Sequence, residues 1–353
     1  SRRTHDEEFM TYKFSVIVLL WILLISPQLA ACGEPPYPIL DSKFPAAEAK
    51  LGWIDNERVI FQGYEPEKFG TKSPKDGHIY DITGLFIWDT ATNAVSKHAS
   101  MEGLTTLCVH AGEVTFAREG MLVAGKLGEE RQTPFPKKHW FNPNSCRYYT
   151  ERPYWSEGGR KGRGIPLLEQ HGYVDFGEQT MDPGRSRPLV LYPPGSKDGI
   201  TLPIRSDQAE VPPVYIAFED AYLLRARQFT SDAVPAWLLK PDGVVTSVFE
   251  PRGEAWERMG WGHYFLTKKG LLITGGRGDY AKVGTMGGYL FSEGKPVRVV
   301  PGLLRNVAVS PDGCKVAFVH VMHSQAGADS FRALQAGKPG TRTLKMIDLC
   351  KGE

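Results

Sequence analysis

The sequence predicts an all-β fold, a six-bladed β-propeller, with five to seven blades compatible with the spacing of its repeats. A motif typical of a β-hairpin recurs along the chain at intervals of 43 to 63 residues. A second hairpin motif follows it in most units. Periods of about 40–50 residues are typical of propellers and other repeat arrays. No stretch after Cys32 carries an apolar stripe of helical period over three turns.

The repeat is clearest in two segments of the chain. Residues 113–125 read EVTFAREGMLVAG, and residues 263–275 read HYFLTKKGLLITG. Each has an apolar run, a polar turn ending in Gly and a second apolar run, which is the pattern of a β-hairpin. When the motif is aligned on its turn, it is found six times, with the turn at or near Glu57, Gly120, Gly172, Ala221, Gly270 and Gly313.

A second hairpin is predicted in each unit. It begins at Gly84, Arg187, Pro235, Gly287 and Arg342, and in the second unit the segment from His139 is expected to take this role. Two hairpins give the four strands of one propeller blade, so that six units give six blades. A pair of β-sandwich domains is the alternative fold, but the uninterrupted period favours the propeller.

Residues 1–31 are predicted to be upstream sequence and a secretory signal. Translation is expected to start at Met10, and Phe14 to Ile25 form an apolar core after the basic Lys13. Twelve helical residues reach about 18 Å, whereas a transmembrane helix must cross roughly 30 Å of hydrocarbon. A transmembrane helix is therefore the weaker interpretation of this segment.

Leu29-Ala30-Ala31-Cys32 resembles the lipobox of bacterial lipoproteins, in which the cysteine is acylated after cleavage. The resemblance implies a protein anchored through Cys32 in the bacterial cell envelope, on the periplasmic or surface face. Gly33 favours the outer membrane by the sorting rule of enterobacteria, and cleavage without acylation is the alternative. The lipidated cysteine and a Pro-rich tether are predicted over residues 32–47, followed by the propeller domain over 48–353.

The remaining cysteines are Cys108, Cys146, Cys314 and Cys350. None of them has the C-x-x-C spacing of a redox motif or a zinc site. An exported protein is permitted disulfides, and four cysteines allow three connectivities. Cys314 and Cys350 fall in the last predicted unit, so we pair them first, with buried free thiols as the alternative.

Two short motifs resemble known propeller families. Residues 306–320 read NVAVSPDGCKVAFVH and resemble the repeat of the Tol-Pal-type periplasmic propellers, with a Ser-Pro-Asp-Gly turn between two strands. Trp88-Asp89 resembles the Trp-Asp ending of WD repeats. These resemblances cover one or two units, and they imply a fold rather than an activity.

The segment 135–164 departs most from the repeat. After Phe135 it holds six further aromatic residues. It also holds seven basic residues and only two acidic ones, in a chain of net charge +2. Arginine beside Tyr and Trp is typical of recognition surfaces for carboxylates and phosphates. The alternative is a blade insertion whose aromatic residues pack on their own blade. The predicted ligand-binding residues are Trp140, Arg147, Tyr149, Arg152, Trp155 and Arg160.

The other candidate sites are weaker. An aromatic cluster that packing also explains comprises Trp256, Arg258, Trp261, His263 and Tyr264. His320 and His323 would lie on opposite faces of a strand, so neither a metal site nor a cofactor is expected. The Gly-rich stretch from Gly275 to Gly288 lacks the spacing of a phosphate loop.

These patterns predict a membrane-anchored envelope lipoprotein that acts as a ligand-binding or scaffold module. Its expected partner is another envelope protein or a cell-wall component, since the low net charge and the export signal argue against nucleic acid. The alternative is a hydrolase or lyase acting on a glycan or peptide in the central channel, which carboxylates at the channel mouth would favour. A third interpretation is a subunit that fills space in an envelope complex, which an exposed apolar patch would favour.

Overall fold

The computed structural model divides the chain into the segment Ser1–Pro36 and a compact unit, Tyr37–Glu353. No helix in the described part of the chain is long and apolar enough to cross a membrane. The predicted signal segment and Cys32 lie outside the described residues. These cover the ranges 37–65, 82–102, 106–137, 140–149, 165–176, 187–205, 208, 210–226, 234–251, 262–275, 286–292, 295–321 and 342–351.

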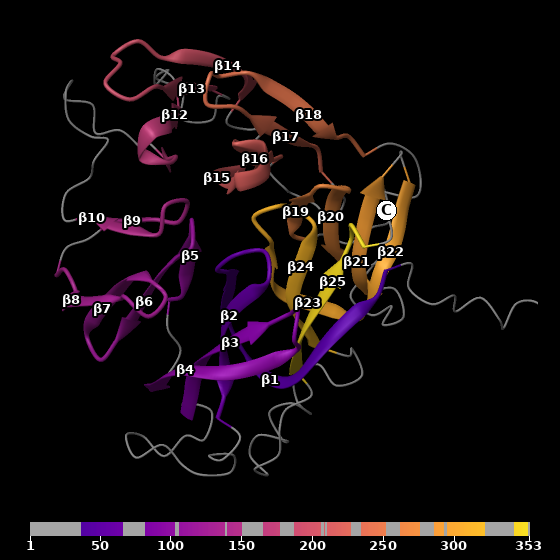
Figure 1. Cartoon of the computed structure of the whole chain (residues 1–353). Helices are drawn as coiled ribbons and strands as arrows, with labels where there is room; N and C mark the ends of the chain where they lie inside the picture. The colour runs from indigo at the N-terminus through magenta and orange to yellow at the C-terminus, as the bar shows by residue number, and fades with distance from the viewer. Residues whose placement is uncertain are drawn as a thin grey trace, which may run out of the picture. The chain divides into compact units, whose positions relative to one another are not determined.

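The described strands form one seven-stranded sheet, four four-stranded sheets and a separate two-stranded sheet, all antiparallel (Figure 1). We divide the seven-stranded sheet at β1, and number the resulting six meanders along the chain. Meander 1 comprises the second part of β1 (Ile39–Trp53), β2 (Arg58–Tyr64), β3 (Ile82–Asp89) and β4 (Ala94–Glu102). Meander 2 comprises β5 (Cys108–His110), β6 (Glu113–Arg118), β7 (Met121–Lys126) and β8 (Arg131–Pro134). Meander 3 comprises β11 (Ile165–Pro166), β12 (Tyr173–Phe176), β13 (Pro188–Tyr192) and β14 (Ile200–Arg205).

The other three meanders follow the same order of strands. Meander 4 comprises β15 (Glu210–Ile216), β16 (Ala221–Arg225), β17 (Ala236–Leu239) and β18 (Val245–Phe249). Meander 5 comprises β19 (Tyr264–Thr267), β20 (Gly270–Gly275), β21 (Gly287–Ser292) and β22 (Lys295–Pro301). Meander 6 comprises β23 (Leu303–Val309), β24 (Lys315–Val321), β25 (Arg342–Asp348) and the first part of β1. Short 3-10 turns lie at η4 (Glu169–His171) and η5 (Ala217–Glu219).

Strand β1 belongs to two meanders. Its start pairs with β25, with Ile39 opposite Ile347, and its end pairs with β2, with Trp53 opposite Val59. This strand corrects two predictions. The Pro-rich segment 32–47 is not an extended tether throughout, because residues 39–47 lie in a strand. The predicted hairpin from Arg342 is the single strand β25, which pairs with β24 on one side and with the first part of β1 on the other.

The prolines explain why the sequence concealed this strand. Pro45 has no N–H for a ladder hydrogen bond, and proline is tolerated mainly in edge strands and at irregularities. The first part of β1 is the outermost strand of meander 6. Its register shifts between Asp41 and Pro45, where Lys43 has a positive φ of 58°.

The repeat motif in the second unit was assigned out of phase. Residues 113–125 form β6 and β7, the second and third strands of meander 2, whereas residues 263–275 contain β19 and β20, the first and second strands of meander 5. The equivalent turn in meander 2 is Ala111-Gly112, between β5 and β6. Strand β5 has only three residues, which is too short to give an alternating pattern.

The predicted second hairpin from His139 is also corrected. Strand β9 (Trp140–Asn142) and strand β10 (Arg147–Tyr149) form a separate two-stranded sheet, and β7 and β8 complete meander 2 instead. The hairpins predicted from Gly84, Arg187, Pro235 and Gly287 are present as β3–β4, β13–β14, β17–β18 and β21–β22.

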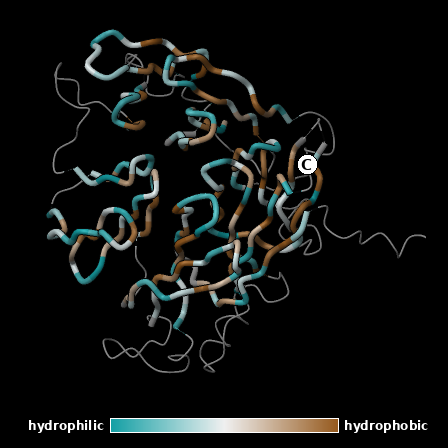
Figure 2. Tube along the Cα trace, in the orientation of Figure 1, coloured by the Kyte–Doolittle hydropathy of each residue, from teal (hydrophilic) through white to brown (hydrophobic). Residues whose placement is uncertain are grey.

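Apolar side chains fill the contacts between most neighbouring meanders, and hydrophobic residues are concentrated along the strands (Figure 2). Between meanders 6 and 1, for example, Phe61 and Trp88 are buried with Val319 and Met346. Similar clusters join meanders 1 and 2, 3 and 4, 4 and 5, and 5 and 6. No such cluster joins meander 2 to meander 3 within the ranges given above; we call this contact the seam.

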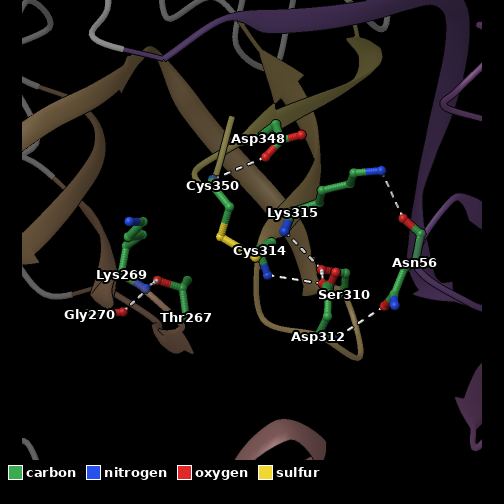
Figure 3. Close-up of a disulfide and its surroundings, with 10 residues drawn as sticks. All are labelled: Asn56, Thr267, Lys269, Gly270, Ser310, Asp312, Cys314, Lys315, Asp348 and Cys350. Carbon is green, nitrogen blue, oxygen red and sulfur yellow. Dashed lines mark hydrogen bonds between the residues drawn. A yellow bond between two sulfur atoms is a disulfide. The ribbon is translucent and has the colours of Figure 1, made fainter. Parts of the chain in front are cut away.

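The Ser-Pro-Asp-Gly turn lies between β23 and β24 (Figure 3). The hydroxyl of Ser310 accepts the backbone N–H of Lys315 at 2.8 Å, and the N–H of Gly313 donates to the carbonyl of Ser310 at 2.9 Å. Gly313 has a φ of +77°, which favours glycine. Cys314 follows the turn and forms a disulfide with Cys350 after β25, the pairing expected from their place in one unit of the repeat.

Candidate functional site

The hairpin β9–β10 is held between meanders 2 and 3. Cys146, in its turn, forms a disulfide with Cys108 of β5, with 5.5 Å between the two Cα atoms. Beside this bond, the hydroxyls of Thr106 and Tyr148 lie 3.3 Å apart. The hairpin is thus covalently attached to the first strand of meander 2.

Two buried asparagines join the same hairpin to the following meanders. The amide of Asn142 donates to the carbonyl of Leu167 at 2.7 Å. The amide of Asn144 donates to the carbonyls of Pro166 and Pro213, each at 3.2 Å, and its oxygen accepts the N–H of Tyr215 at 3.0 Å. Both asparagines are almost fully buried, at 0% and 8% exposure, so their hydrogen bonds hold the hairpin in place.

These attachments bring His110, at the end of β5, close to Arg147, at the start of β10. The imidazole of His110 is half-buried, and its ring centre lies 6.1 Å from that of Tyr215. Burial lowers the pKa of His110; Glu169 opposes the shift, and the Arg147 guanidinium adds to it. His110 is therefore a neutral imidazole at neutral pH, beside an exposed guanidinium.

A chain of polar groups continues from Tyr215. Its hydroxyl donates to Oδ1 of Asp220 at 2.9 Å, and the same oxygen lies 3.7 Å from Nε2 of His171. On the other side of that imidazole, Nδ1 lies 2.8 Å from the hydroxyl of Tyr222, which accepts the N–H of Leu168 at 2.8 Å. The chain runs from exposed Asp220 to fully buried Tyr222.

Two tight turns position this chain. Gly172 follows His171 with a φ of +86°, and a Cβ there would lie 1.9 Å from the carbonyl oxygen of Tyr192, so that only glycine fits. Asp220 adopts the left-handed conformation at the end of η5. Asp tolerates this conformation better than most residues because its side chain bonds locally.

The arrangement is suited to binding. Burial and the hydrogen bond to Asp220 raise the pKa of Tyr215 to about 12, so its hydroxyl stays protonated and cannot act as a base near neutrality. Arg147 offers a forked donor, and His110 offers a neutral imidazole. Among the residues that the structure describes, no group of three or more His, Cys, Asp or Glu could hold a metal ion.

The predicted ligand-binding residues fall partly in this site. Arg147 is exposed in β10, Trp140 is 44% exposed in β9, and the hydroxyl of Tyr149 is buried without a hydrogen-bond partner. The remaining three, Arg152, Trp155 and Arg160, lie outside the described residues.

Part of the predicted segment packs on itself. The ring of Tyr148 lies 5.1 Å from that of Phe135 and 4.7 Å from that of Phe141. The packing interpretation therefore applies to these aromatic residues, while Trp140 and Arg147 face solvent.

The other candidate sites are described only in part. Of the second aromatic cluster, Trp256, Arg258 and Trp261 are outside the described residues, whereas His263 is exposed and the hydroxyl of Tyr264 accepts the N–H of Val234 at 2.8 Å. The Arg225 guanidinium lies 5.5 Å from the centre of the Tyr264 ring. These contacts are those of a packed aromatic residue.

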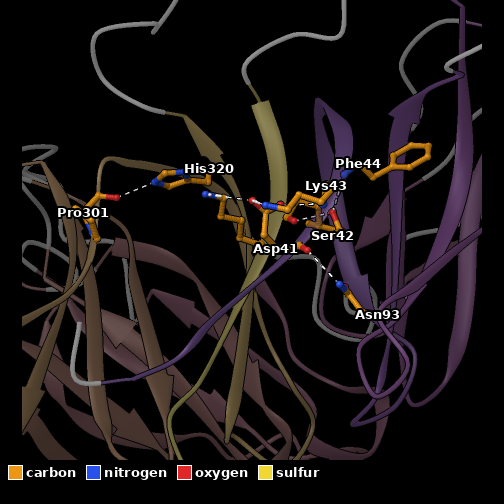
Figure 4. Close-up of polar contacts among 9 residues, drawn as sticks. Asp41, Ser42, Lys43, Phe44, Asn93, Pro301 and His320 are labelled. Atoms are coloured by element: carbon orange, nitrogen blue, oxygen red, sulfur yellow. Dashed lines mark hydrogen bonds and ion pairs between the residues drawn. The ribbon is translucent and has the colours of Figure 1, made fainter. Parts of the chain in front are cut away.

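His320 is buried in β24, and its Nε2 lies 2.8 Å from the carbonyl of Pro301 (Figure 4). Burial lowers its pKa, and the hydrogen bond to Pro301 opposes that shift. His323 lies outside the described residues, as do the Gly-rich residues 276–285.

Sequence reasoning missed His110, His171, Tyr215, Asp220 and Tyr222. Three of them share a signal that could have been found: His110, His171 and Asp220 each lie at or within the connection between the first and second strands of consecutive meanders. The turn placed at Gly120 instead of Gly112 removed His110 from that comparison. The two tyrosines carry no signal in sequence, because cross-meander contacts decide their role.

No protein-family model and no curated protein matches the chain. Among solved structures, the β-propeller domain of the trilobed protease from Pyrococcus furiosus matches with a TM-score of 0.52 and 12% identity, over 88% of this chain and 97% of that one. The chain has a β-propeller fold. An oligogalacturonate lyase in complex with manganese matches with a TM-score of 0.51 and 10% identity, over 90% of this chain and 96% of that one. At these identities the likeness shows the fold alone.

Proposed function

We propose that this protein is a lipid-anchored, six-bladed β-propeller of the bacterial cell envelope, which captures a partner bearing carboxylate or phosphate groups. The observation that carries the proposal is the fixed hairpin β9–β10. A disulfide and buried amide hydrogen bonds hold Arg147 beside His110, with Trp140 exposed on the same hairpin. An arginine and an exposed tryptophan on one fixed hairpin are residue types typical of binding hot spots.

The sharing of β1 supports six blades. One strand supplies the outer edge of meander 6 and the first strand of meander 1, so it joins the last unit of the repeat to the first. Each meander then has four strands, which is the number in a propeller blade.

The lipobox-like sequence at Cys32 supports anchoring, with the outer membrane favoured by Gly33. Two disulfides fit an oxidising compartment such as the periplasm. Intact-mass analysis of the N-terminus tests this part. A mass that includes two or three acyl chains on Cys32 is expected, and an unmodified N-terminus would contradict it.

The binding proposal is tested with Arg147→Glu, and with the triple change at Arg147, Arg152 and Arg160. Partner capture from the envelope fraction should fall at least tenfold in both. The thermal stability of Arg147→Glu should stay nearly unchanged, because the charge of an exposed residue such as Arg147 contributes little to folding. Arg131→Glu is the matched control, since Arg131 is exposed on β8 and makes the same change of charge. Capture that survives in the Arg147 variant would contradict the proposal.

One observation favours a second function, an enzyme acting on a glycan or peptide. His110 is a neutral imidazole beside Glu169 and Arg147, a combination found in general-base sites. His110→Gln should then abolish turnover of a glycan or peptide substrate while leaving its binding intact.

The strands that would line the central channel of the proposed propeller favour binding over catalysis. The first strands of the meanders carry partly exposed apolar side chains, and none of their described side chains is acidic, a set that includes Leu51, Val109, Val214, Phe265 and Val307. The carboxylates that would favour an enzyme in the channel are thus not found among those side chains.

A further inference from the structure

The seam is held together differently from the other contacts between meanders. Elsewhere in the described chain, apolar clusters of eight to ten buried residues join one meander to the next. At the seam, the hairpin β9–β10 provides the described attachments. Its bonds to meanders 3 and 4 come from Asn142, Asn144 and Ser145, whose hydroxyl donates to Glu169 at 2.7 Å.

On the side of meander 2, the hairpin is attached to β5 and to the segment that precedes β9. These attachments include the disulfide between Cys108 and Cys146, the contact between the hydroxyls of Thr106 and Tyr148, and the packing of Tyr148 on Phe135. The disulfide is the covalent bond between the hairpin and β5. It lies next to both groups of the capture site, because His110 is two residues after Cys108 and Arg147 follows Cys146.

The second disulfide provides a contrast within the same molecule. Cys314 and Cys350 lie at one end of β24 and β25, which already pair over seven positions. The same strands contribute Val316, Phe318 and Ile347 to the apolar cluster with meander 5. Breaking this disulfide leaves the ladder and the cluster to hold its two strands together.

We propose that the Cys108–Cys146 disulfide is a latch for the capture site. In its closed state it fixes the hairpin against β5. When a dithiol reductant transfers two electrons and two protons to it, the sulfur–sulfur bond becomes two thiols and the reductant becomes a disulfide. The hairpin then separates from β5 and stays bonded to meanders 3 and 4, so Arg147 is no longer held beside His110.

The partial exposure of Cys108 supports this inference, because a thiolate must reach a sulfur atom to exchange with it. The inference rests on the proposed function, since the latch controls the site assigned to capture. The test of the latch needs no partner, so failure of the latch can be distinguished from failure of the proposed capture function.

Hydrogen exchange of the full chain tests the latch, with C108S/C146S compared with C314S/C350S. The two disulfides close loops of nearly equal length, with sequence separations of 38 and 36, so the general effect on chain entropy is matched. We expect amide exchange in residues 106–110 and 140–149 to rise at least tenfold in C108S/C146S alone. Exchange that is unchanged in these segments, or raised equally in both variants, would overturn the proposal.

A second measurement covers the case in which C108S/C146S does not fold. Wild-type protein is titrated with dithiothreitol below its unfolding conditions, and the thiols are labelled and located by mass. Labelling of Cys108 and Cys146 while β24 and β25 keep their protection is expected. Reduction of both disulfides together, only as the whole unit unfolds, would contradict the latch.

Discussion

The contact between meanders 5 and 6 and the seam between meanders 2 and 3 show two ways of joining neighbouring sheets. The first buries Leu272, Phe318 and Ile347 completely, and each such side chain contributes about 1.5–3 kcal/mol. The seam relies on one disulfide and on buried amide hydrogen bonds. Each hydrogen bond contributes about 0.5–1.5 kcal/mol net. The apolar contact is strong but places no chemical group, whereas the polar contact positions Arg147 and His110.

The difference between the two contacts also explains where the polar groups of the candidate site lie. A neutral histidine, a protonated tyrosine and an exposed guanidinium all lie at or next to the seam. Polar groups of this kind are costly in an apolar contact unless every one is hydrogen-bonded. The described residues of the seam form no apolar cluster between the two meanders, so polar groups are accommodated there at lower cost.

The largest expected effect comes from the apolar side of the comparison. Phe318→Ala should lower the free energy of unfolding by about 3–5 kcal/mol, because a fully buried ring leaves a cavity. Tyr148→Ala in the seam should cost less than half as much. Urea titrations of the two variants measure the difference, and equal losses would show that the seam is packed like the other contacts.

Removing either disulfide should have the next largest effect. By the chain-entropy account, removing a disulfide that closes a loop of this length lowers the free energy of unfolding by about 3–4 kcal/mol. We expect similar losses for C108S/C146S and C314S/C350S in global unfolding, although only the first loosens the hairpin. A much larger loss in C314S/C350S would mean that the last strands depend on their disulfide rather than on their ladder.

Asn144→Ala should cost about 1–3 kcal/mol, because it leaves the carbonyls of Pro166 and Pro213 and the N–H of Tyr215 without the partner they have now. Asn56→Ala is the control, since the side-chain oxygen of this exposed residue accepts the N–H of Asp312 at 3.0 Å. Thermal unfolding compares the two variants. A smaller loss of stability for Asn144→Ala than for Asn56→Ala would show that the hairpin does not contribute to the stability of the fold.

The smallest effect is that of pH. Burial lowers the pKa of His320 below its ordinary value of 6.5, so the unfolded chain binds more protons than the folded one just below that pH. The stability due to neutral His320 is therefore present above pH 6.5 and is lost as the pH falls through the folded pKa. His320→Gln should flatten this part of the stability profile; an unchanged profile would assign the loss to other groups.

His110 has the same sign of shift but lies at the seam, half-buried beside charged neighbours. Its protonation should loosen the seam before it affects global stability. Hydrogen exchange at pH 7.5 and 5.5 checks this, with residues 140–149 expected to gain exchange first and His110→Gln expected to abolish the difference.

The sequence predicted much of the fold for a physical reason. Short apolar runs separated by turn residues define hairpins locally, so four of the second hairpins and the turn at Gly313 were found where the structure has them. The pairing of Cys314 with Cys350 followed from their place in one unit. Local pattern failed where pairing is not local, as in β1, whose partner β25 lies about three hundred residues away in the chain.

The candidate site was predicted only in part. The composition of the segment 135–164 drew attention to Arg147 and Trp140, because Arg and Trp cluster there. The groups around His110 come from β10, η4 and β15, and their meeting depends on the disulfide at Cys108 and on Asn144. A contact made by three separate meanders leaves no spacing in the sequence from which to predict it.

Site-specific photocrosslinking tests the central claim most directly, namely that the hairpin in the seam is the capture surface. A benzophenone side chain is placed at Trp140, and at Ile200 as a control that is exposed to a similar degree on β14 of meander 3. The account predicts that position 140 crosslinks one envelope partner, that Arg147→Glu removes this crosslink, and that position 200 gives none. A partner crosslinked at position 200, or a crosslink at 140 that Arg147→Glu leaves intact, would contradict it.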